Sequence, residues 1–491
     1  MPDIAATRPA SGPAMPSLRA IAAIALPMTG LMLCHLGISM TDLWVTGRID
    51  SSVQAALGVV AQIFIVLMLI TSIAGSGCLA AVSQALGAGN PLRARRYAGL
   101  IVSLAFTAGS LVGGVAYLLL PGFMELFNVP EDVAPALRVF LQAYCLQLPF
   151  FYCLILLNSV FRAHKLVWLP FGAFVLVLAA NFAGSAGFGL GWWGLPNFGY
   201  AGVAWSTFGS TLLGLACNLA AARRHRILGR SSFAPWKWNR RAMPYIFKVG
   251  LPSALGQMAA QGGGLVLLAM LTHLPDAAEQ MAGQMSGQVD GRTGGSLNGV
   301  AAMTLGMRLL SVALFPLGAI SLTLAIFSGH LLGARQEETL YRFGLRAARL
   351  NFLLFLLPAA LIFMLREPLA AFFSYEQAVL EKASLYLAFN SLTLPCLAVT
   401  TALGGINSGA GATRFNCLVG VATMWGVQLP LAWLLAYGLG WGERGIFMAM
   451  PAADLAAMLC MLQVYRSKKW LACGLKKRQP ARSGIKLETA T

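Results

Sequence analysis

Charged residues are scarce in this sequence, and acidic residues are the scarcest. Of 491 residues only 11% are Asp, Glu, Lys or Arg, whereas 58% are hydrophobic and the mean hydropathy is +0.71. Soluble domains carry roughly 25% charged residues. The composition therefore excludes an ordinary soluble protein and indicates a chain that is dissolved in a lipid bilayer.

The sequence also lacks the motifs of a metal or catalytic centre. Its nine cysteines lie mostly inside apolar runs, with no CxxC pair and no metal-binding spacing, which is typical of small packing residues. We find no HExxH motif, no paired carboxylates and no credibly placed Ser/His/Asp set. We therefore expect no enzyme activity, no metal site and no organic cofactor.

Basic residues outnumber acidic residues by 35 to 17, which gives a formal net charge of +18. They lie between apolar segments rather than on a helix face beside aromatic residues, which argues against nucleic acid as a partner. Most of them follow the even-numbered apolar runs, so we expect these connections and both termini to face the cytoplasm. Such charge also attracts anionic membrane lipids.

Long apolar runs recur along the whole chain. A spanning helix needs about 20 residues. The runs that meet this length lie at about 20–45, 54–84, 97–120, 136–161, 167–191, 199–222, 245–273, 298–331, 346–365, 378–407, 415–438 and 443–465. The expected fold is an all-α integral membrane protein with twelve transmembrane helices. Polar tails at 1–19, expected to be disordered, and at 467–491 flank them.

The second half of the chain repeats the first. Residues 83–96 resemble residues 328–342, and Gly87 recurs 246 positions later as Gly333. Duplicated apolar patterns are typical of transporters built from two related helical bundles. Because both halves contain an even number of runs, they enter the membrane in the same orientation. We expect them to be related by an axis along the membrane normal.

The repeat sets the expected domain boundaries. An N-terminal six-helix bundle covers 20–222, a basic cytoplasmic linker covers 223–243, and a C-terminal six-helix bundle covers 244–466. The second half has about 21 extra residues between its first two runs, in the glycine-rich segment 276–295. Such a composition predicts a flexible outer loop.

Short motifs in both halves match a known family in their order and spacing. They are Ala25–Pro27, Asp42 in SMTDLWVTGRI, QALGAGNPLRARR, FRAHKLVWLP (161–170), Asn181, GYAGVAWST (199–207), KVGLPSALGQM (248–258), GHLLGARQEE (329–338), SGAGATR (408–414), VQLPLAWLL (427–435) and KKW (468–470). Over residues 18–470 the chain resembles the multidrug and toxic compound extrusion (MATE) family of the multidrug/oligosaccharidyl-lipid/polysaccharide flippase superfamily.

The resemblance implies two pseudo-symmetric six-helix bundles around a central cavity. It also implies export of bulky, amphipathic or cationic small molecules in exchange for H⁺ or Na⁺. We expect a monomer in the bacterial inner (plasma) membrane. The alternatives are a Na⁺-coupled exporter, or a flippase for lipid-linked saccharides. The flippase would need a strongly cationic cavity, and the few basic residues inside the apolar runs argue against it.

Asp42 is the main candidate for binding the coupling ion. A carboxylate at bilayer depth costs about 2.5–3.5 kcal/mol, so it needs a reason to be there. The resemblance implies that Asp42 binds the cation and that Asn181 and Thr207 accompany it. Ser185 stands where family members often have a second Asp, which favours H⁺ over Na⁺. The alternative for Asp42 is an interfacial residue that faces the outer water.

Two more residues lie on the same apolar run as Asp42. Pro27 has no N–H group and interrupts the helical hydrogen bonds, so we expect the helix to bend there when Asp42 is protonated; a static kink is the alternative. His35 lies seven residues before Asp42, on the same helix face. It is a candidate proton relay or an ordinary packing residue.

The substrate cavity should be apolar and aromatic, with adaptable methionines. Candidate lining residues are Tyr144, Gln147, Phe150, Phe151, Met258, Gln261 and Met307. Asp454 is the one acid well inside an apolar run of the second half. It is a candidate for binding a cationic substrate or for pairing with a neighbouring helix, and Arg308 either serves as its counter-ion or extends to the membrane surface.

Overall fold

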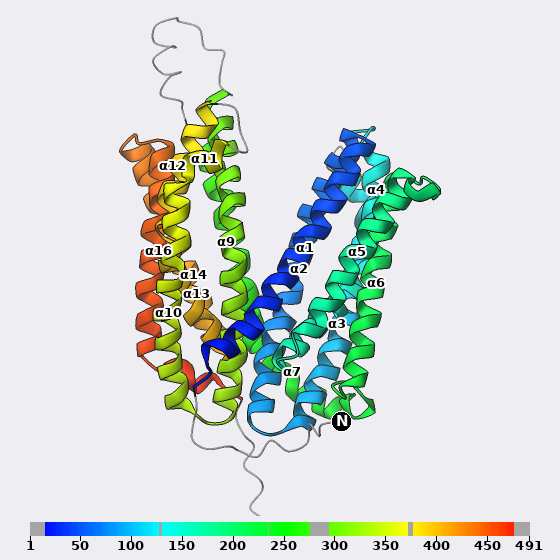
Figure 1. Cartoon of the computed structure of the whole chain (residues 1–491), viewed down its shortest axis with the longest axis vertical. Helices are drawn as coiled ribbons and strands as arrows, with labels where there is room; N and C mark the ends of the chain where they lie inside the picture. Colours follow the sequence, from blue (N-terminus) through cyan, green and yellow to red (C-terminus); the bar gives the residue numbers. More distant parts are fainter. Residues whose placement is uncertain (1–14, 127–129, 234, 275–293, 372–376, 476–491) are drawn as a thin grey trace, which may run out of the picture.

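The apolar runs form long helices that lie side by side (Figure 1). The computed structural model describes residues 15–126, 130–233, 235–274, 294–371 and 377–475, and within these ranges all regular secondary structure is helical. Eleven helices are long and apolar enough to cross a membrane, or twelve when one bent pair is counted as a single span. The prediction of an all-α protein with many spans is confirmed.

The two halves contribute matching sets of helices. The first half contains α1 (Leu18–Ile49), α2 (Ser51–Gly87), α3 (Pro91–Leu126), α4 (Ala134–Ala163), α5 (Trp168–Leu190), η1 (Trp192–Gly194), α6 (Tyr200–Arg224) and η2 (Arg230–Ser232). The second half contains α7 (Trp236–Thr272), α9 (Gly294–Gly333), α10 (Glu337–Met364), α11 (Arg366–Ala371), α12 (Gln377–Ser391), α13 (Leu394–Gly409), α14 (Thr413–Thr423), η3 (Met424–Gln428), α15 (Leu429–Trp433), η4 (Leu434–Gly438), α16 (Glu443–Arg466) and η5 (Lys469–Cys473).

The tenth span differs from the prediction, which treated 378–407 as one continuous run. α12 and α13 meet at an angle of 50°. Pro395 lies in the first turn of α13, where its missing N–H and its ring prevent an uninterrupted helix. Thr393 therefore lies at a break in the middle of the second half, where backbone groups leave the helical pattern.

Two segments expected to lie outside the helical bundles are more ordered than predicted. α7 begins at Trp236, so the linker expected at 223–243 is shorter than predicted; Trp238 packs edge-on against Tyr97 of α3. The tail expected from 467 onward begins with η5, where Trp470 is fully buried and stacks on Tyr465. In both cases aromatic side chains within a basic segment hold it against the helices.

Three expectations lie mainly outside the described residues. These concern most of the tail at 1–19, the tail beyond residue 475, and the outer loop at 276–295, of which only the last two residues are described.

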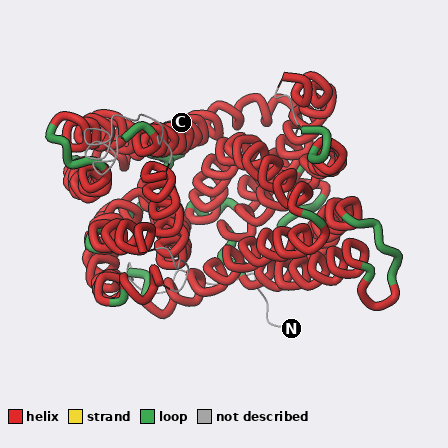
Figure 2. The backbone as a smooth tube through the Cα atoms, turned by 90° about the horizontal axis from the view of Figure 1, so that it is seen from above, coloured by secondary structure: helices red, strands yellow, loops and turns green. Residues whose placement is uncertain are grey.

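The helices form two lobes that meet at one end and diverge toward the other (Figure 1). One lobe holds α1 to α6 and the other holds α10 to α16. Two helices join them: α7 packs against α2 and α14, and α9 packs against α2, α12 and α13. Figure 2 shows the same arrangement from above, as a cluster of helices. The largest hydrophobic core contains residues of both lobes, whereas two smaller cores lie within single lobes.

The repeat is visible in the backbone as well as in the sequence. Gly199 and Gly442, which precede α6 and α16, have nearly identical dihedral angles, with φ of 56° and 57° and ψ of −134° in both. Positive φ values also recur at equivalent turns. The pairs are Gly89 and Arg335, Lys165 and Gly411, and Arg226 and Lys468. The halves therefore share one backbone plan even where their residue types differ.

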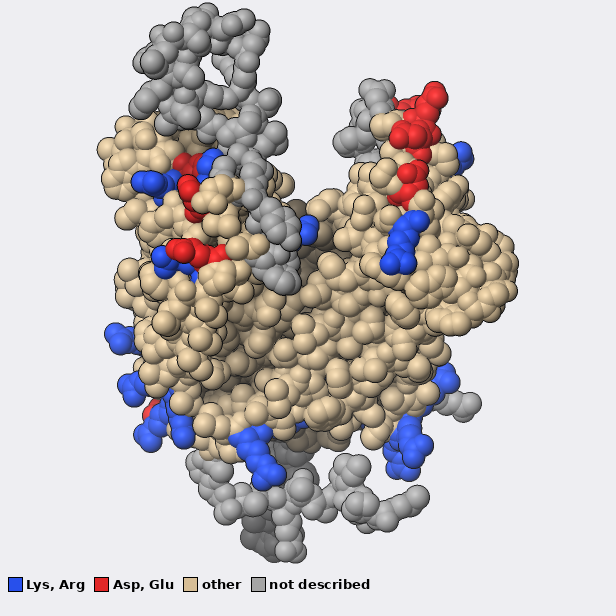
Figure 3. Space-filling model, turned by 45° about the horizontal axis from the view of Figure 1, so that its top comes forward, with Lys and Arg blue, Asp and Glu red and all other residues tan. Residues whose placement is uncertain are grey.

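Charged side chains are distributed unevenly between the two ends (Figure 3). Lys and Arg residues dominate the end where the lobes meet, which carries the α2–α3 and α9–α10 turns; we refer to it as the basic end. Asp and Glu residues gather on the tips of the lobes at the opposite end. A hollow separates the lobes on that side of the visible surface.

Candidate functional site

Asp42 lies within α1, in the half of the helix that is remote from the basic end. Its side chain is buried, with 4% of its surface exposed. None of the ion pairs among the described residues involves it. Polar side chains from two neighbouring helices surround the carboxyl group instead.

Those polar side chains are the three that the sequence analysis grouped with Asp42. Asn181 Nδ2 and Ser185 Oγ of α5 each lie 3.2 Å from Asp42 Oδ1, and Thr207 Oγ1 of α6 lies 3.0 Å from Oδ2. Asn181 Nδ2 also donates to Thr207 Oγ1, at 3.1 Å. The structure therefore brings together residues that are up to 165 positions apart in the sequence.

The local sequence explains this convergence. Asn181 and Ser185 are four residues apart, so both lie on the same face of α5. Glycines bring the neighbouring helices close: a Cβ atom at Gly189 of α5 would press against Val203 of α6 and Val45 of α1. α1, α5 and α6 can thus approach closely enough for short side chains to meet Asp42.

The hydrogen bonds suit an ionised carboxylate, which accepts only. Asn181 and Ser185 donate to one oxygen. Thr207 has a single hydroxyl hydrogen, which it shares between Asp42 Oδ2 and the Val203 carbonyl 3.1 Å away. The Asn181 Oδ1 atom is buried and has no hydrogen-bond partner in the described part of the chain. The site thus has a spare acceptor beside the carboxylate.

A second layer connects this site to α4. Gln147 Nε2 donates to Thr211 Oγ1 at 2.7 Å, and Thr211 Oγ1 donates to the Thr207 carbonyl at 2.9 Å. Tyr144 lies one turn before Gln147 and packs edge-on against Phe64 of α2. Two of the predicted cavity residues therefore lie within the first lobe, and Gln147 is linked to the carboxylate site through Thr211.

The other predicted residues of α1 lie nearer the basic end. His35 packs between Phe151 and Phe174, with ring centroids 5.9 and 5.1 Å away. Pro27 is buried within α1, and its neighbour Met28 accepts a hydrogen bond from Thr323 of α9 at 3.6 Å. α1 thus extends from the carboxylate site to a contact with the second half.

Asp50 provides a contrasting carboxylate at the far end of the same helix. It is exposed, and the Ser52 hydroxyl lies 2.6 Å from its Oδ2 atom. That hydrogen bond, with those from Ser51, holds the pKa of Asp50 below its usual value. Asp50 therefore stays ionised in neutral solution and serves as a comparison for the buried Asp42.

The second half contains the remaining predicted residues. Asp454 of α16 is half-buried and lies near Thr393, at the break between α12 and α13, whose hydroxyl donates to the Asn390 carbonyl at 2.9 Å. Arg308 is exposed and forms no ion pair with Asp454 among the described residues. Exposed side chains of the second half include Met258, Gln261 and Met307.

The sequence analysis missed two polar neighbours of these groups, Thr211 beside Gln147 and Thr393 near Asp454. Nothing in the sequence singled out Thr211 as the partner of Gln147, because the contact depends on the rotation of α4 against α6. Thr393 carried a weak signal, since it stands two residues before Pro395.

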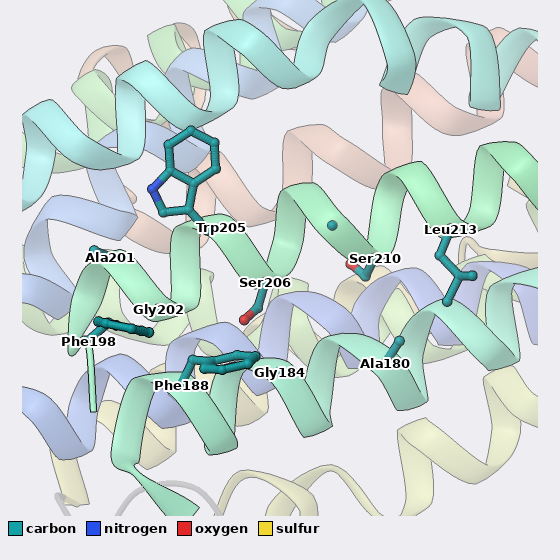
Figure 4. A pocket seen from close by; sticks show the side chains of 11 residues that line it. Ala180, Gly184, Phe188, Phe198, Ala201, Gly202, Trp205, Ser206, Ser210 and Leu213 are labelled. Atoms are coloured by element: carbon teal, nitrogen blue, oxygen red, sulfur yellow. The ribbon is translucent and has the colours of Figure 1, made fainter. Parts of the chain in front are cut away.

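A largely apolar groove lies elsewhere, between α5 and α6 (Figure 4). Its volume is about 690 Å³ and its walls are small and aromatic residues, among them Gly184, Phe188 and Trp205. Ser206 points toward Gly184 in this groove, whereas its neighbour Thr207 bonds to Asp42. The groove is therefore separate from the carboxylate site.

Comparison with known proteins agrees with the arrangement of the helices. The sequence profile of the MatE family matches residues 27–185 and 285–434. The chain belongs to the MatE family. Its members are transporters rather than enzymes, so this chain is a multi-pass membrane transporter.

Individual relatives extend over almost the whole MatE chain. A probable multidrug resistance protein NorM from Pseudomonas aeruginosa is 26% identical over 93% of this chain and 91% of its own length. A protein from Shewanella oneidensis named FAD transporter is 25% identical over 89% and 92%. The crystal structure of the Vibrio cholerae MATE transporter VcmN in its bent form superposes with a TM-score of 0.79 at 20% identity, covering 92% of this chain and 98% of VcmN.

Proposed function

We propose that this transporter exports bulky amphipathic or cationic small molecules in exchange for inward-moving protons, and that Asp42 carries the proton. The observation that carries the proposal is a buried carboxylate with three hydrogen-bond donors and no cationic partner among the described residues. Relatives named multidrug resistance proteins support the substrate class. No organic cofactor is needed, and a monomer suffices.

The distribution of charge supports an orientation. Basic residues are enriched in cytoplasmic connections of membrane proteins. The basic end is then the cytoplasmic side of a bacterial inner membrane, with both termini inside. In this orientation the hollow between the lobes opens to the outside (Figure 3). Asp42 then lies in the outer half of the membrane, where an external proton has a short path to it.

Protonation would change the hydrogen bonds around Asp42. A protonated carboxyl group must donate one hydrogen, and it accepts more weakly than a carboxylate. Asn181 Oδ1 is the spare acceptor beside it, and Thr207 is then free to bond fully to the Val203 carbonyl. These changes loosen α1 from α5 and α6. Pro27, which interrupts the hydrogen-bond ladder of α1, is the point where the helix bends in response.

The substrate would bind between the lobes. We assign Met258 and Gln261 to its wall because they are exposed on α7, and Asp454 to its cationic group. Tyr144 and Gln147 would connect the substrate cavity with the Asp42 site through Thr211. Two carboxylates within the helices, the buried Asp42 and the half-buried Asp454, favour a cationic over an anionic substrate, although one relative bears the name FAD transporter.

Sodium is the second candidate for the coupling ion. The carboxylate, Asn181 Oδ1 and two hydroxyls supply hard oxygen ligands of the kind that small cations prefer. A single carboxylate, with Ser185 in place of a second one, favours the proton. A lipid-linked saccharide remains the alternative substrate, for which a cationic cavity would be needed.

Imposing proton and sodium gradients separately tests the proposal. Proteoliposomes containing the transporter and a fluorescent lipophilic cation, ethidium, should show coupled flux with a proton gradient and none with a sodium gradient alone. Asp42→Asn should abolish the proton-driven flux, whereas Asp50→Asn, on the same helix, should retain it. Wild-type flux in Asp42→Asn, or flux driven by sodium alone, would contradict the assignment.

A further inference from the structure

The basic end is closed where α2 of the first half meets α9 of the second. Equivalent residues in this region are 246 positions apart. The turns after the two helices repeat the same hydrogen bonds, for example Ala88 N to the Gln84 carbonyl and Ala334 N to the His330 carbonyl, both at 3.0 Å. Gln84 and His330 therefore occupy equivalent positions in the two halves.

Their side chains cross between the lobes in opposite directions. Gln84 Nε2 donates to the Gly409 carbonyl, at the end of α13, at 2.8 Å. His330 Nε2 lies 2.9 Å from the Ala163 carbonyl, at the end of α4; since a carbonyl only accepts, Nε2 is the protonated nitrogen. Ala163 and Gly409 are again 246 positions apart. Each half thus holds the last turn of a helix in the other half by a symmetry-related hydrogen bond.

The backbones are equally close and equally symmetric. A Cβ atom at Gly87 would collide with the backbone of His330, and one at Gly333 would collide with the backbone of Gln84. Ser83 lies against Gly329, its equivalent in the other half, which marks the pseudo-twofold axis. Only glycine permits so close an approach at positions 87 and 333.

Further contacts surround the two bonds. Gln84 Oε1 accepts from Leu475 N at 2.8 Å and lies 3.3 Å from the Tyr245 hydroxyl, so every partner of its amide belongs to the second half. On the other side of the axis, Lys165 Nζ lies 4.8 Å from the centre of the Phe327 ring. The segment that follows α16 therefore also helps to hold Gln84 in place for its bond to Gly409, through Leu475 N.

We propose that these two reciprocal hydrogen bonds, with Gly87 and Gly333, form a clasp that keeps the basic end closed and must release for that end to open. Separating α2 from α9 breaks both bonds and both backbone contacts at once, so the clasp opens cooperatively. Its members lie neither at the Asp42 site nor in the substrate cavity. The clasp therefore sets the balance between molecules that are open at the outer end and molecules that are open at the basic end. This inference rests on the proposed transport cycle only in requiring that the basic end opens.

Distance measurements between two spin labels test the clasp without measuring transport. Trp168 and Arg414 are equivalent, exposed positions on α5 and α14, near the basic end. Both are replaced with labelled cysteine in full-length protein whose native cysteines have been removed. Electron–electron double resonance then gives the ratio of open to closed molecules at this end.

His330→Ala should raise that ratio roughly two- to tenfold, the effect of losing one ordinary hydrogen bond, and Gln84→Ala should raise it at least as much, because its amide also bonds to Leu475 N. The double variant should raise it by about the product. His330→Gln should behave like the wild type, because glutamine makes the equivalent bond in the other half. Gly333→Ala should open the same end without removing a hydrogen-bonding side chain, which provides a test if the alanine variants at 84 and 330 do not fold.

Asn90→Ala is the matched control. Asn90 lies in the same turn, but its side chain accepts a hydrogen bond from Arg93 N at 2.9 Å, within the first half. It should leave the ratio unchanged. An unchanged ratio in the Gln84, His330 and Gly333 variants, or an equal shift in Asn90→Ala, would overturn the clasp. Wild-type proton coupling in Asp42→Asn, together with the expected shifts in the clasp variants, would refute the Asp42 assignment and leave this inference standing on its own.

Discussion

Thr207→Val should make the transporter bind its coupling proton more tightly. Valine has nearly the same shape as threonine but cannot donate to Asp42 Oδ2, now 3.0 Å from the Thr207 hydroxyl. A hydrogen bond to a charged group contributes about 1.5–3 kcal/mol, and we take the lower value because the Thr207 hydrogen is shared with the Val203 carbonyl. About 1.4 kcal/mol corresponds to one pH unit.

The sign follows from which form the bond stabilises. Thr207 donates to the ionised carboxylate, so its removal destabilises that form and favours the protonated one. The pH midpoint of substrate-induced proton release in proteoliposomes should therefore move upward by about one unit. Proton release should become slower at low pH, because fewer molecules lose their proton on the inside.

Two further variants separate this effect from general damage. Thr207→Ser keeps the hydroxyl and should retain the wild-type midpoint. Ser206→Ala changes the neighbouring residue, whose side chain lies in the groove between α5 and α6, and should also retain it (Figure 4). A Thr207→Val midpoint that stays at the wild-type value, or that moves equally in Ser206→Ala, would refute the assignment of Thr207 to the proton site.

Three more predictions address the rest of the transport pathway. Pro27→Ala restores a backbone N–H to α1 and should lower the turnover rate several-fold without lowering thermal stability; unchanged turnover would exclude a bend at this position. Asp454→Asn should raise the KM for ethidium while leaving the KM for an uncharged amphipathic substrate unchanged, and equal effects on both would exclude a charge contact. Thr211→Val leaves the buried Gln147 amide unpaired and should reduce stability by about 1–3 kcal/mol, measured by thermal unfolding in detergent; Thr211→Ser should restore it.

The spans were predictable from a local signal, whereas the residues around Asp42 also required the family motifs. Apolar length alone gives the helices. Asn181 and Ser185 are one helical turn apart, so once α5 faces α1 both reach the same carboxyl group. The order of family motifs supplied Asp42 and Thr207. The structure joins these residues by hydrogen bonds, although their role in coupling is still a proposal.

Other features depend on how helices pack, and the sequence does not encode this locally. The contact between Gln147 and Thr211 needs the rotation of α4 relative to α6. The clasp was hidden for a different reason: Gln84 and His330 are equivalent but chemically unlike, so a search for repeated residue types passes over them. Their equivalence follows from the register of 246 positions that Gly87 and Gly333 set in the sequence, and the matching turns of the backbone agree with it.

The unequal chemistry of the two halves gives α1 a particular importance. In the repeat, the positions equivalent to Asp42 and Thr207 are Leu267 and Met450. Both are buried in an apolar core of the second half. On the proposed mechanism, proton binding at Asp42 would change the charge of one lobe only, whereas the clasp needs both lobes. α1 connects the two: it carries Asp42, then Pro27, then a contact between Met28 and Thr323 of α9, seven residues before His330. A bend of α1 would thus act on the same helix that supplies one half of the clasp.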